Sequence, residues 1–310
     1  MDLCKEKRFI NLNGKIHINE KNNKVVSLVD KNNNVWVVKK KLSEGSFGEI
    51  YLYNSSNPEY VDVVIKYFKG DDKEVILDME QESEIVELFN KYKCRNFVRS
   101  GVKELSNQRK IIILERVDSD LGDFDFSVYP KPLKIYSQLI EFIYSGSKCA
   151  YRKDKLFLDM KPENIGYKLC NDGVKFTFLD LGSFFDINEE EVTATYHINL
   201  EKSGDFSNDI MFVYSAVMTL LVIRLMISDR SEANSFVDYF LDEIASEKKY
   251  SGRRGLLPKK NYQRIVKKFK GYLDTKEKFI EYLFETLDSM THKKPSIGDF
   301  LTGLNDNNNY

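Results

Sequence analysis

Residues 157–182 constrain the fold of this chain more than any other segment. Within the run 157–165, a carboxylate, an amine and an amide fall close together, at Asp159, Lys161 and Asn164. Sixteen residues beyond Asn164, an apolar run ends in Asp180-Leu181-Gly182, which brings a carboxylate to a turn. An acid that can accept a proton, a cation and two oxygen donors suited to Mg²⁺ are the groups that phosphoryl transfer requires.

The hydrophobic pattern changes from strand-like to helix-like along the chain. The first third is rich in β-branched and aromatic residues separated by turn residues, and it contains one amphipathic helix, expected over 72–91. From about Leu133 the pattern is mostly helical, with short strands near 155–158, 165–169 and 175–179. This order predicts an α+β fold with a β-rich small lobe followed by a mostly helical large lobe. The earlier strands are expected near 24–29, 34–38, 49–53, 61–66, 97–103 and 110–117.

A glycine-containing turn lies between two of the expected strands. The segment 42–51 reads LSEGSFGEIY, with Gly45, Ser46, Phe47 and Gly48 at the turn. Glycines let a backbone approach an anion closely and point its N–H groups at phosphate oxygens. The alternative is an ordinary hairpin whose glycines serve only the turn geometry.

Lys66 ends an apolar strand 18 residues after Gly48. It could be an outward-facing residue of an alternating strand, or a point charge for phosphate oxygens held by a carboxylate. Glu82 is the preferred carboxylate, because the apolar stripe that follows it would dock the helix with Glu82 at its edge. Glu84 is the second choice, and the other helix acids, Glu80 and Glu87, are interpreted as solvated charge.

With these motifs in view, the chain resembles the eukaryotic protein kinases from about Trp36 to Leu301. The resemblance implies a bilobal fold, with an N-terminal extension over 1–35, a small lobe over 36–116, a large lobe over 117–304 and a tail over 305–310. Because Lys161 follows Asp159 by two residues, the loop resembles the Ser/Thr branch of that family.

The resemblance also implies a role for each motif residue. Lys66 would hold the α- and β-phosphates of ATP and pair with Glu82, Asp159 would be the catalytic base assisted by Lys161, and Asn164 and Asp180 would hold Mg²⁺. Asp209 would brace the catalytic loop from below, and Leu114 would guard the back of the adenine site. The nucleotide contacts would be Gly45, Ser46, Phe47, Gly48, Ile50, Val64, Lys66, Glu115, Val117 and Gly166.

Several positions depart from the family pattern. Ser43 replaces the first loop glycine, Leu181 replaces the Phe of the metal turn, and 196–199 stands where Ala-Pro-Glu is expected. Phe157 and Leu158 replace the usual His-Arg, so the chain is a non-RD kinase by resemblance. Without that Arg, we expect activity that needs no phosphorylation of the activation loop.

The adenine site also departs from the family. Val64 is larger than the usual Ala on its roof, and Gly166 is smaller than the usual residue on its floor. We predict that adenine sits slightly lower than is usual, which would conserve the volume of the site.

The net charge, the longest apolar run and the cysteines limit the possible partners and the cellular compartment. The formal net charge of −1 does not favour bulk attraction to nucleic acid or membranes, so neither is required as a partner. The apolar run 210–223 is shorter than the roughly 20 residues of a membrane span, and we expect a buried core helix there. The N-terminus has no signal-peptide pattern, and four scattered cysteines favour reduced thiols. We therefore expect a cytoplasmic protein, in the host cytoplasm if its source is a virus or an intracellular bacterium.

Residues 248–270 contain ten Lys or Arg residues and no Asp or Glu. This segment could dock an acidic or phosphorylated protein substrate, or it could be a solvated face balanced by acids elsewhere. The leading hypothesis is an ATP-dependent Ser/Thr protein kinase. A pseudokinase that binds nucleotide or acts as a scaffold is the alternative, and a kinase of small molecules is a third.

Overall fold

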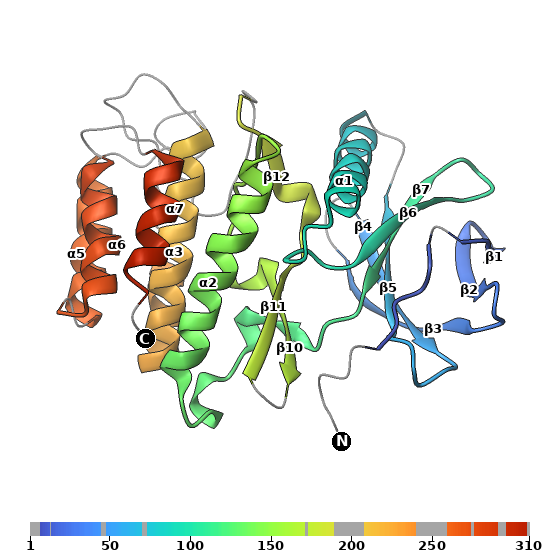
Figure 1. Cartoon of the computed structure of the whole chain (residues 1–310), viewed down its shortest axis with the longest axis horizontal. Coiled ribbons are helices and arrows are strands. Elements are labelled where there is room, and N and C mark those ends of the chain that lie inside the picture. The colour runs from blue at the N-terminus through green and yellow to red at the C-terminus, as the bar shows by residue number, and fades with distance from the viewer. Residues whose placement is uncertain are drawn as a thin grey trace. The chain divides into compact units, whose positions relative to one another are not determined.

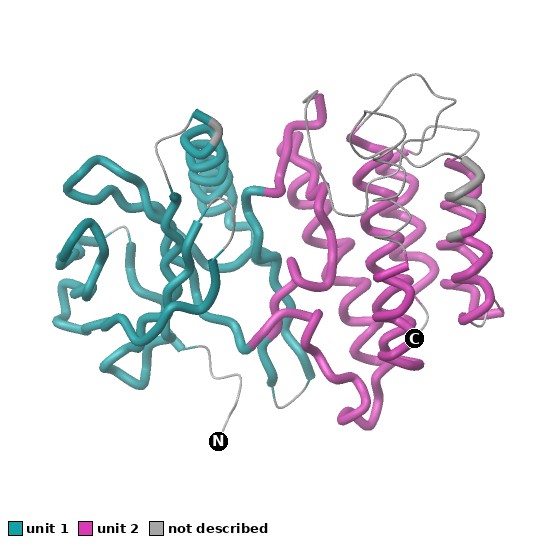
Figure 2. Tube along the Cα trace, turned by 180° about the vertical axis from the view of Figure 1, so that it is seen from behind, with its two compact units in different colours: residues 1–118, 168–182 teal, residues 119–167, 183–310 magenta. Residues whose placement is uncertain are grey.

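The computed structural model describes residues 7–12, 14–44, 48–69, 73–170, 173–188, 208–239, 259–273, 276–290 and 296–308. The chain forms two compact units, coloured separately in Figure 2. Unit 1 comprises residues 1–118 and 168–182, and unit 2 comprises residues 119–167 and 183–310. The chain therefore leaves unit 1 twice, whereas a single boundary, between residues 116 and 117, is expected from the sequence.

Unit 1 is built on a seven-stranded antiparallel sheet with the order β1-β2-β3-β4-β5-β7-β6. The strands predicted between residues 24 and 117 all occur in it, and an additional strand, β1, lies at one edge. The strands are β1 (Ile16–Lys21), β2 (Lys24–Asp30), β3 (Val35–Glu44), β4 (Gly48–Ser55), β5 (Val63–Phe68), β6 (Ser100–Glu104) and β7 (Lys110–Glu115).

Alternate residues of β5 serve opposite faces of the sheet. Val63, Ile65 and Tyr67 belong to a buried apolar cluster that also contains Trp36 and Ile113. Successive strand residues point to opposite faces, so Val64 and Lys66 face the other way. The hydrophobic alternation of β5 thus presents Lys66 to the face away from that cluster.

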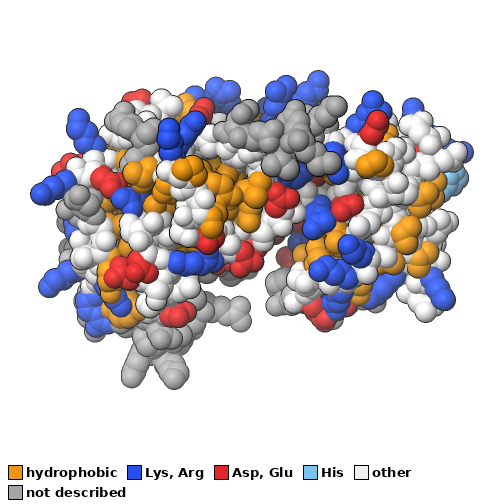
Figure 3. All heavy atoms as spheres, turned by 90° about the horizontal axis from the view of Figure 1, so that it is seen from below, with side chains coloured by type: hydrophobic (Ala, Val, Ile, Leu, Met, Phe, Trp, Pro, Cys, Tyr) orange, Lys and Arg blue, Asp and Glu red, His pale blue; other side chains and the backbone are white. Residues whose placement is uncertain are grey.

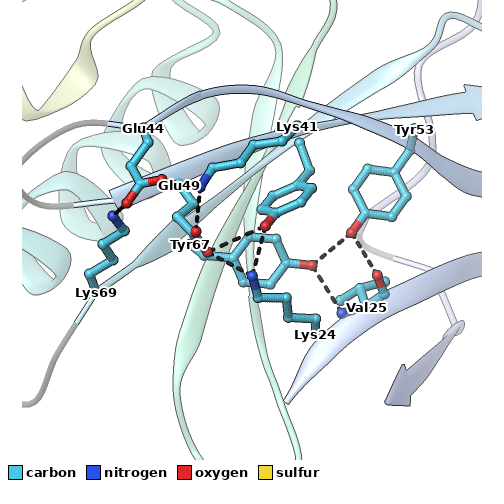
Figure 4. A network of polar contacts seen from close by, with 9 residues as sticks. Lys24, Val25, Lys41, Glu44, Glu49, Tyr53, Tyr67 and Lys69 are labelled. Atoms are coloured by element: carbon cyan, nitrogen blue, oxygen red, sulfur yellow. Dashed lines mark hydrogen bonds and ion pairs between the residues drawn. The ribbon is translucent and has the colours of Figure 1, made fainter. Parts of the chain in front are cut away.

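The N-terminal segment, which is the described part of residues 1–35, supplies several side chains to the apolar cluster of unit 1. Ile10, Val25 and Leu28 are all buried in it. The Val25 N–H donates to the Tyr67 hydroxyl over 3.0 Å, and the Tyr53 hydroxyl donates to the Val25 carbonyl over 2.7 Å (Figure 4). The segment is therefore part of the core of unit 1.

Helix α1 (Lys73–Tyr92) packs by the apolar stripe that the sequence predicted (Figure 1). Ile85, Val86 and Phe89 are buried, and the Phe89 ring stacks on that of Phe97 with centroids 3.9 Å apart. The helix contacts β6 and β5. This docking fixes which side of α1 faces Lys66.

A later part of the chain returns to unit 1 and carries Asp180 with it. Of β10 (Ile165–Cys170), the end from Lys168 onward belongs to this unit, and so does the whole of β11 (Gly173–Phe178). The Phe178 N–H donates to the Asn96 carbonyl over 2.9 Å, and the Val98 N–H donates to the Phe178 carbonyl over 3.2 Å. These bonds hold the end of β11 two residues before Asp180.

Unit 2 is mostly helical and centres on α3 (Asn208–Ser228). This helix is long and apolar enough to cross a membrane, but 94% of its most apolar window is buried inside the protein. An all-round apolar helix is typical of a protein core, and the predicted core helix is confirmed. It contacts α2, α6 and α7. Further helices of this unit include α2 (Pro132–Tyr151), α5 (Lys259–Tyr272), α6 (Lys278–Ser289) and α7 (Ile297–Asp306), and residues 230–239 are also helical.

Short strands frame the loop that contains Asp159. Strand β9 (Lys155–Phe157) pairs with β12 (Phe184–Asp186), and β8 (Ser119–Asp120) pairs with the start of β10. Within the β9–β12 pair, the Phe157 and Phe184 rings stack with centroids 4.7 Å apart. Residues 158–164 therefore run between two strands that are each anchored in unit 2.

The cysteines differ from the expectation of reduced thiols. Among the residues that the structure describes, no cysteine is a free thiol, and Cys94, Cys149 and Cys170 are disulfide-bonded. Disulfide formation depends on the separation of Cα atoms in space, which spacing along the sequence does not reveal.

Candidate functional site

Three charged side chains converge in unit 1. The Lys66 Nζ lies 2.5 Å from Glu82 Oε2 and 3.9 Å from Asp180 Oδ1. Lys66 comes from β5, Glu82 from α1, and Asp180 from the turn after β11. Glu82 is only 3% exposed, whereas the alternative choice, Glu84, is exposed. The docking of α1 thus selects Glu82 as the partner of Lys66.

Burial and charge shift the pKa values of this pair. Burial lowers the pKa of Lys66, but the carboxylates of Glu82 and Asp180 outweigh it, so the net shift is upward. Burial raises the pKa of Glu82, and the neighbouring Lys66 opposes that shift. Lys66 is therefore held as a cation, with one carboxylate in direct contact and a second nearby.

Residues on both sides of segment 45–47 are paired or closely packed in the sheet. Gly45, Ser46 and Phe47 lie outside the described residues, whereas Gly48 opens β4 and is buried. A Cβ atom at Gly48 would lie 2.5 Å from the Tyr67 carbonyl oxygen, so β5 approaches too closely for a side chain. Ser43, at the place of the missing glycine, is paired with Ile50 as ordinary strand.

Ion pairs hold the two strands on either side of this turn (Figure 4). Lys41 contacts both Glu44 and Glu49, at the ends of β3 and β4 respectively, and Lys69 contacts Glu44. Lys24 of the N-terminal segment lies 2.8 Å from Glu49. Hydrogen bonds from Lys24 and Lys41 lower the pKa of Glu49 to about 2. Sequence reasoning missed this network, because strand register decides which exposed charges meet.

The residues predicted to contact adenine from unit 1 lie on adjacent strands. Val64 is paired with Leu114 across β5 and β7, and Ile50 is paired with Lys66 across β4 and β5. Glu115 ends β7, and its side chain bonds to Arg99 and Lys168. Val117 follows β7 and is half-buried. These placements put Val64 on β5, the strand of Lys66, and Ile50 and Glu115 on its two neighbours, β4 and β7.

A second group of charged and polar side chains forms in unit 2. Lys161 Nζ lies 2.8 Å from Asp159 Oδ2. The Asn164 amide nitrogen donates to the Asp159 carbonyl over 2.8 Å and to its Oδ2 over 3.2 Å. Because the nitrogen is committed to Asp159, the amide oxygen of Asn164 is the atom that can bind a cation.

A buried threonine supports this loop, and sequence reasoning did not identify it. Thr219 of α3 is fully buried, and its hydroxyl donates to the Met160 carbonyl over 2.7 Å. The predicted brace, Asp209, lies in the first turn of the same helix and is half-buried. The one available signal for Thr219 was its hydroxyl within an apolar run, and that signal is weak.

The departures before Asp159 are explained by packing. Phe157 and Leu158 are almost completely buried, and the Leu158 N–H donates to the Ser183 carbonyl over 3.1 Å.

Gly166, the predicted adenine floor, is a buried residue of β10 opposite Asp120. Val64 and Gly166 belong to different units, so the proposed exchange of volume between them stays a prediction.

Each unit offers an oxygen donor of the kind that Mg²⁺ prefers. Within the described part of the chain, no three His, Cys, Asp or Glu side chains form a metal cage. Mg²⁺ in nucleotide enzymes is bound by one or two protein oxygen ligands together with substrate phosphates. Asp180 of unit 1, whose side chain is 36% exposed, is an oxygen ligand of that kind, and the amide oxygen of Asn164 in unit 2 is another.

Comparison with known proteins identifies the fold. No family model matches the sequence, and no curated protein matches it. Among solved structures, the PK-1 kinase of the Cydia pomonella granulovirus superposes with a TM-score of 0.58 and 16% identity, covering 86% of this chain and 92% of that one. The kinase domain of PF14_0431 gives a TM-score of 0.55 and 13% identity, covering 86% and 94%. The bilobal α+β fold predicted from the sequence is therefore confirmed, and the chain has a protein-kinase-like fold.

Proposed function

We propose that this chain is an ATP-dependent protein kinase that transfers the γ-phosphate to Ser or Thr residues. The observation that carries the proposal is the buried Lys66–Glu82 ion pair with Asp180 3.9 Å from the same amine. A desolvated lysine held by one carboxylate and flanked by a second is costly to bury. Such an arrangement suits a site that must receive both phosphate and a divalent cation.

Each side chain has a defined part in this proposal. Lys66 would donate hydrogen bonds to phosphate oxygens, and Glu82 would keep its amine in place. Asp159 would accept the proton of the substrate hydroxyl, while Lys161 beside it would neutralise charge on the phosphate that moves. Asn164 and Asp180 would hold Mg²⁺, which when bound neutralises charge that develops on the phosphate oxygens. Catalysis would thus depend mainly on positioning and electrostatic stabilisation.

Activity without phosphorylation of the activation loop is also part of the proposal. The side chain before Asp159 is the buried Leu158, so this position offers no cation to a phosphorylated loop. The residues of the expected loop, including 196–199, lie outside the described residues. Comparing activity before and after phosphatase treatment tests this point, and equal activity is the expected result.

We propose an acidic or phosphorylated protein as the substrate, docked by the basic segment 248–270. Residues 248–258 lie outside the described residues. Of the later lysines, Lys268 lies over the Tyr239 ring and Lys270 pairs with Asp288, so the fold itself uses both. On the face drawn in Figure 3, side chains of both charge signs are interspersed, which does not favour bulk attraction to polyanions.

The proposed compartment remains the cytoplasm, of a host cell if the source is a virus or an intracellular bacterium. The cysteines do not support this proposal, because disulfides persist mainly in oxidising compartments. Imaging of the tagged protein in its cell of origin tests it, and a secreted or lumenal signal would contradict it.

The proposed reaction is tested by transfer of labelled γ-phosphate from Mg-ATP to a generic basic protein and to the chain itself. We expect transfer by the unmodified protein and none by Lys66→Met or Asp180→Ala, with the fold of both variants retained. Exposed Glu84→Ala is the matched control and should keep full activity. Normal activity in both site variants would overturn the assignment.

A pseudokinase is the second candidate, favoured by the burial of Phe157 and Leu158 in place of the expected polar pair. The same assay separates the two, because a pseudokinase would bind nucleotide and transfer nothing. A kinase of small molecules would consume ATP with neither protein substrate labelled.

A further inference from the structure

A cavity of about 410 Å³ opens in unit 1, away from the residues assigned to phosphoryl transfer. Its walls come from the N-terminal segment, the turn after β2 and the neighbourhood of Tyr60. None of its lining residues is one of the predicted site residues. Its volume is in the range of pockets that hold small molecules or a few peptide side chains.

Cations dominate the lining of this cavity. Its lining includes four basic residues, Arg8, Lys15, Lys31 and Arg99, and one acidic residue, Asp30. The Asp30 carboxylate is 5% exposed and accepts hydrogen bonds from the Asn34 side chain and from the N–H groups of Asn32 and Asn34. That carboxylate is bonded within its own turn, and Arg99 is paired with Glu115, so the positive charge that a ligand can reach comes from the exposed Arg8, Lys15 and Lys31.

Arg99 and Arg8, two of the four basic residues, differ in how firmly their guanidinium groups are held. Arg99 is held by two hydrogen bonds to Glu115 and donates to the Lys7 carbonyl over 3.1 Å, which fixes its guanidinium. Arg8 lies 3.9 Å from Glu59, and both side chains are about 70% exposed. Exposed pairs of this kind contribute little, so an incoming anion can compete for Arg8 at low cost.

The aromatic residues of the wall are already engaged. The Arg99 guanidinium lies 5.6 Å from the centroid of the Phe9 ring. Tyr60 is 8% exposed and meets Trp36 edge-on, with ring centroids 5.4 Å apart. Both rings thus already have a partner in the fold, and the exposed lining groups are cations, so the cavity suits a phosphate group.

We propose that this cavity binds the phosphoserine or phosphothreonine side chain of a phosphorylated peptide. A phosphate monoester carries about −1.5 to −2 charges at pH 7 and three strong acceptor oxygens, which several Lys and Arg side chains can satisfy together. The site would attach an already phosphorylated protein to unit 1 through the N-terminal segment. Binding at this site requires no phosphoryl transfer, so it can be tested without reference to the proposed reaction.

The test is fluorescence anisotropy with labelled degenerate peptide sets that carry a central phosphoserine, phosphothreonine, serine or glutamate. We expect binding of the phosphorylated sets, weaker binding of the glutamate set and none of the serine set. The full-length Asp180→Ala variant is titrated beside the unmodified protein without ATP, and equal binding is expected. A loss of transfer activity would then leave this result unaffected.

The decisive comparison is between two double variants. Lys15→Ala with Lys31→Ala removes two exposed cations of the cavity, and we expect at least roughly tenfold weaker binding. Lys39→Ala with Lys40→Ala removes two exposed cations of β3 outside the lining and should change the affinity less than about twofold. Rising salt should also weaken binding.

Three outcomes would overturn the proposal. They are no phosphate-dependent binding in any set, equal effects of the two double variants, and displacement of the peptide by an equal concentration of inorganic phosphate. The last result would identify a site for small anions in place of a peptide site.

Discussion

At the scale of single residues, the chemistry proposed for unit 1 depends on one buried carboxylate beside one lysine. Glu82→Gln keeps the shape of the side chain and removes the charge that holds Lys66. We expect roughly a hundredfold loss in kcat/KM for protein phosphorylation, the order found when one preorganised electrostatic contact is removed. Glu84→Gln, two residues away on the exposed side of α1, should leave kcat/KM unchanged. Equal effects of the two substitutions would contradict the pairing.

Glu49 predicts a pH dependence of stability. Its pKa is about 2 in the folded protein, against 4.5 as the ordinary value, because Lys24 and Lys41 donate to it. A carboxylate with a lowered pKa stabilises the fold above the ordinary value, and this contribution is lost as the pH falls toward 2. The free energy of unfolding of Glu49→Gln should therefore be lower than that of the unmodified protein at pH 6. The difference should shrink between pH 4.5 and pH 2, and urea unfolding over this range checks it.

At the scale of elements, helix α3 both fills the core of unit 2 and holds the loop that contains Asp159. Thr219→Val keeps the volume of the side chain but leaves the buried Met160 carbonyl without its donor. We expect a cost of about 1–3 kcal/mol in the free energy of unfolding, together with a lower kcat, because the loop loses its support.

Ser215→Ala is the matched control for this prediction. Ser215 is also buried in α3, but its hydroxyl donates to the Phe212 carbonyl of the same helix. Its removal should cost less stability and should leave kcat unchanged. A similar fall of kcat in both variants would show that α3 acts through general stability, contrary to the role assigned to Thr219.

Helices and strands could be predicted from the sequence where a single hydrophobic pattern specified them. The stripe of Ile85, Val86 and Phe89 predicted both α1 and the choice of Glu82. Thr219 could not be identified, because one hydroxyl in an apolar helix gives no indication of the carbonyl it meets. The ion pairs of Lys24, Lys41 and Glu49 depend on strand register, which composition does not specify.

At the scale of the whole molecule, the N-terminal segment is a structural part of unit 1. Removal of residues 1–33 would uncover the apolar cluster around Trp36, Tyr53 and Ile65. Loss of the buried Ile10, Val25 and Leu28 side chains alone should cost roughly 5 kcal/mol or more. Thermal unfolding and light scattering of the truncated protein should show a lower Tm and aggregation, and an unchanged Tm would contradict this account.

Leu28→Ala is a milder test of the same contact. It should cost about 2–5 kcal/mol in the free energy of unfolding, because it leaves a cavity in a fully buried position. Val37→Ala lies on the adjacent β3 at a position that is 51% exposed, and it should change this free energy by less than about 0.5 kcal/mol.

The order of strands and helices was enough to predict the bilobal α+β fold. The return of residues 168–182 to unit 1 was not predictable, because it depends on backbone bonds between Phe178 and residues 96–98. Disulfide bonding of Cys94, Cys149 and Cys170 was missed for a similar reason, since it depends on proximity in space.

The proposed function requires that Lys66, Asp159, Asn164 and Asp180 act on one nucleotide. The most direct measurement is a crystal structure of the protein with Mg²⁺ and a non-hydrolysable ATP analogue. The account predicts Lys66 Nζ within about 3 Å of a phosphate oxygen. It also predicts Asp180 and Asn164 oxygens at about 2.1 Å from Mg²⁺. A nucleotide bound elsewhere, or metal ligands that include neither residue, would contradict it.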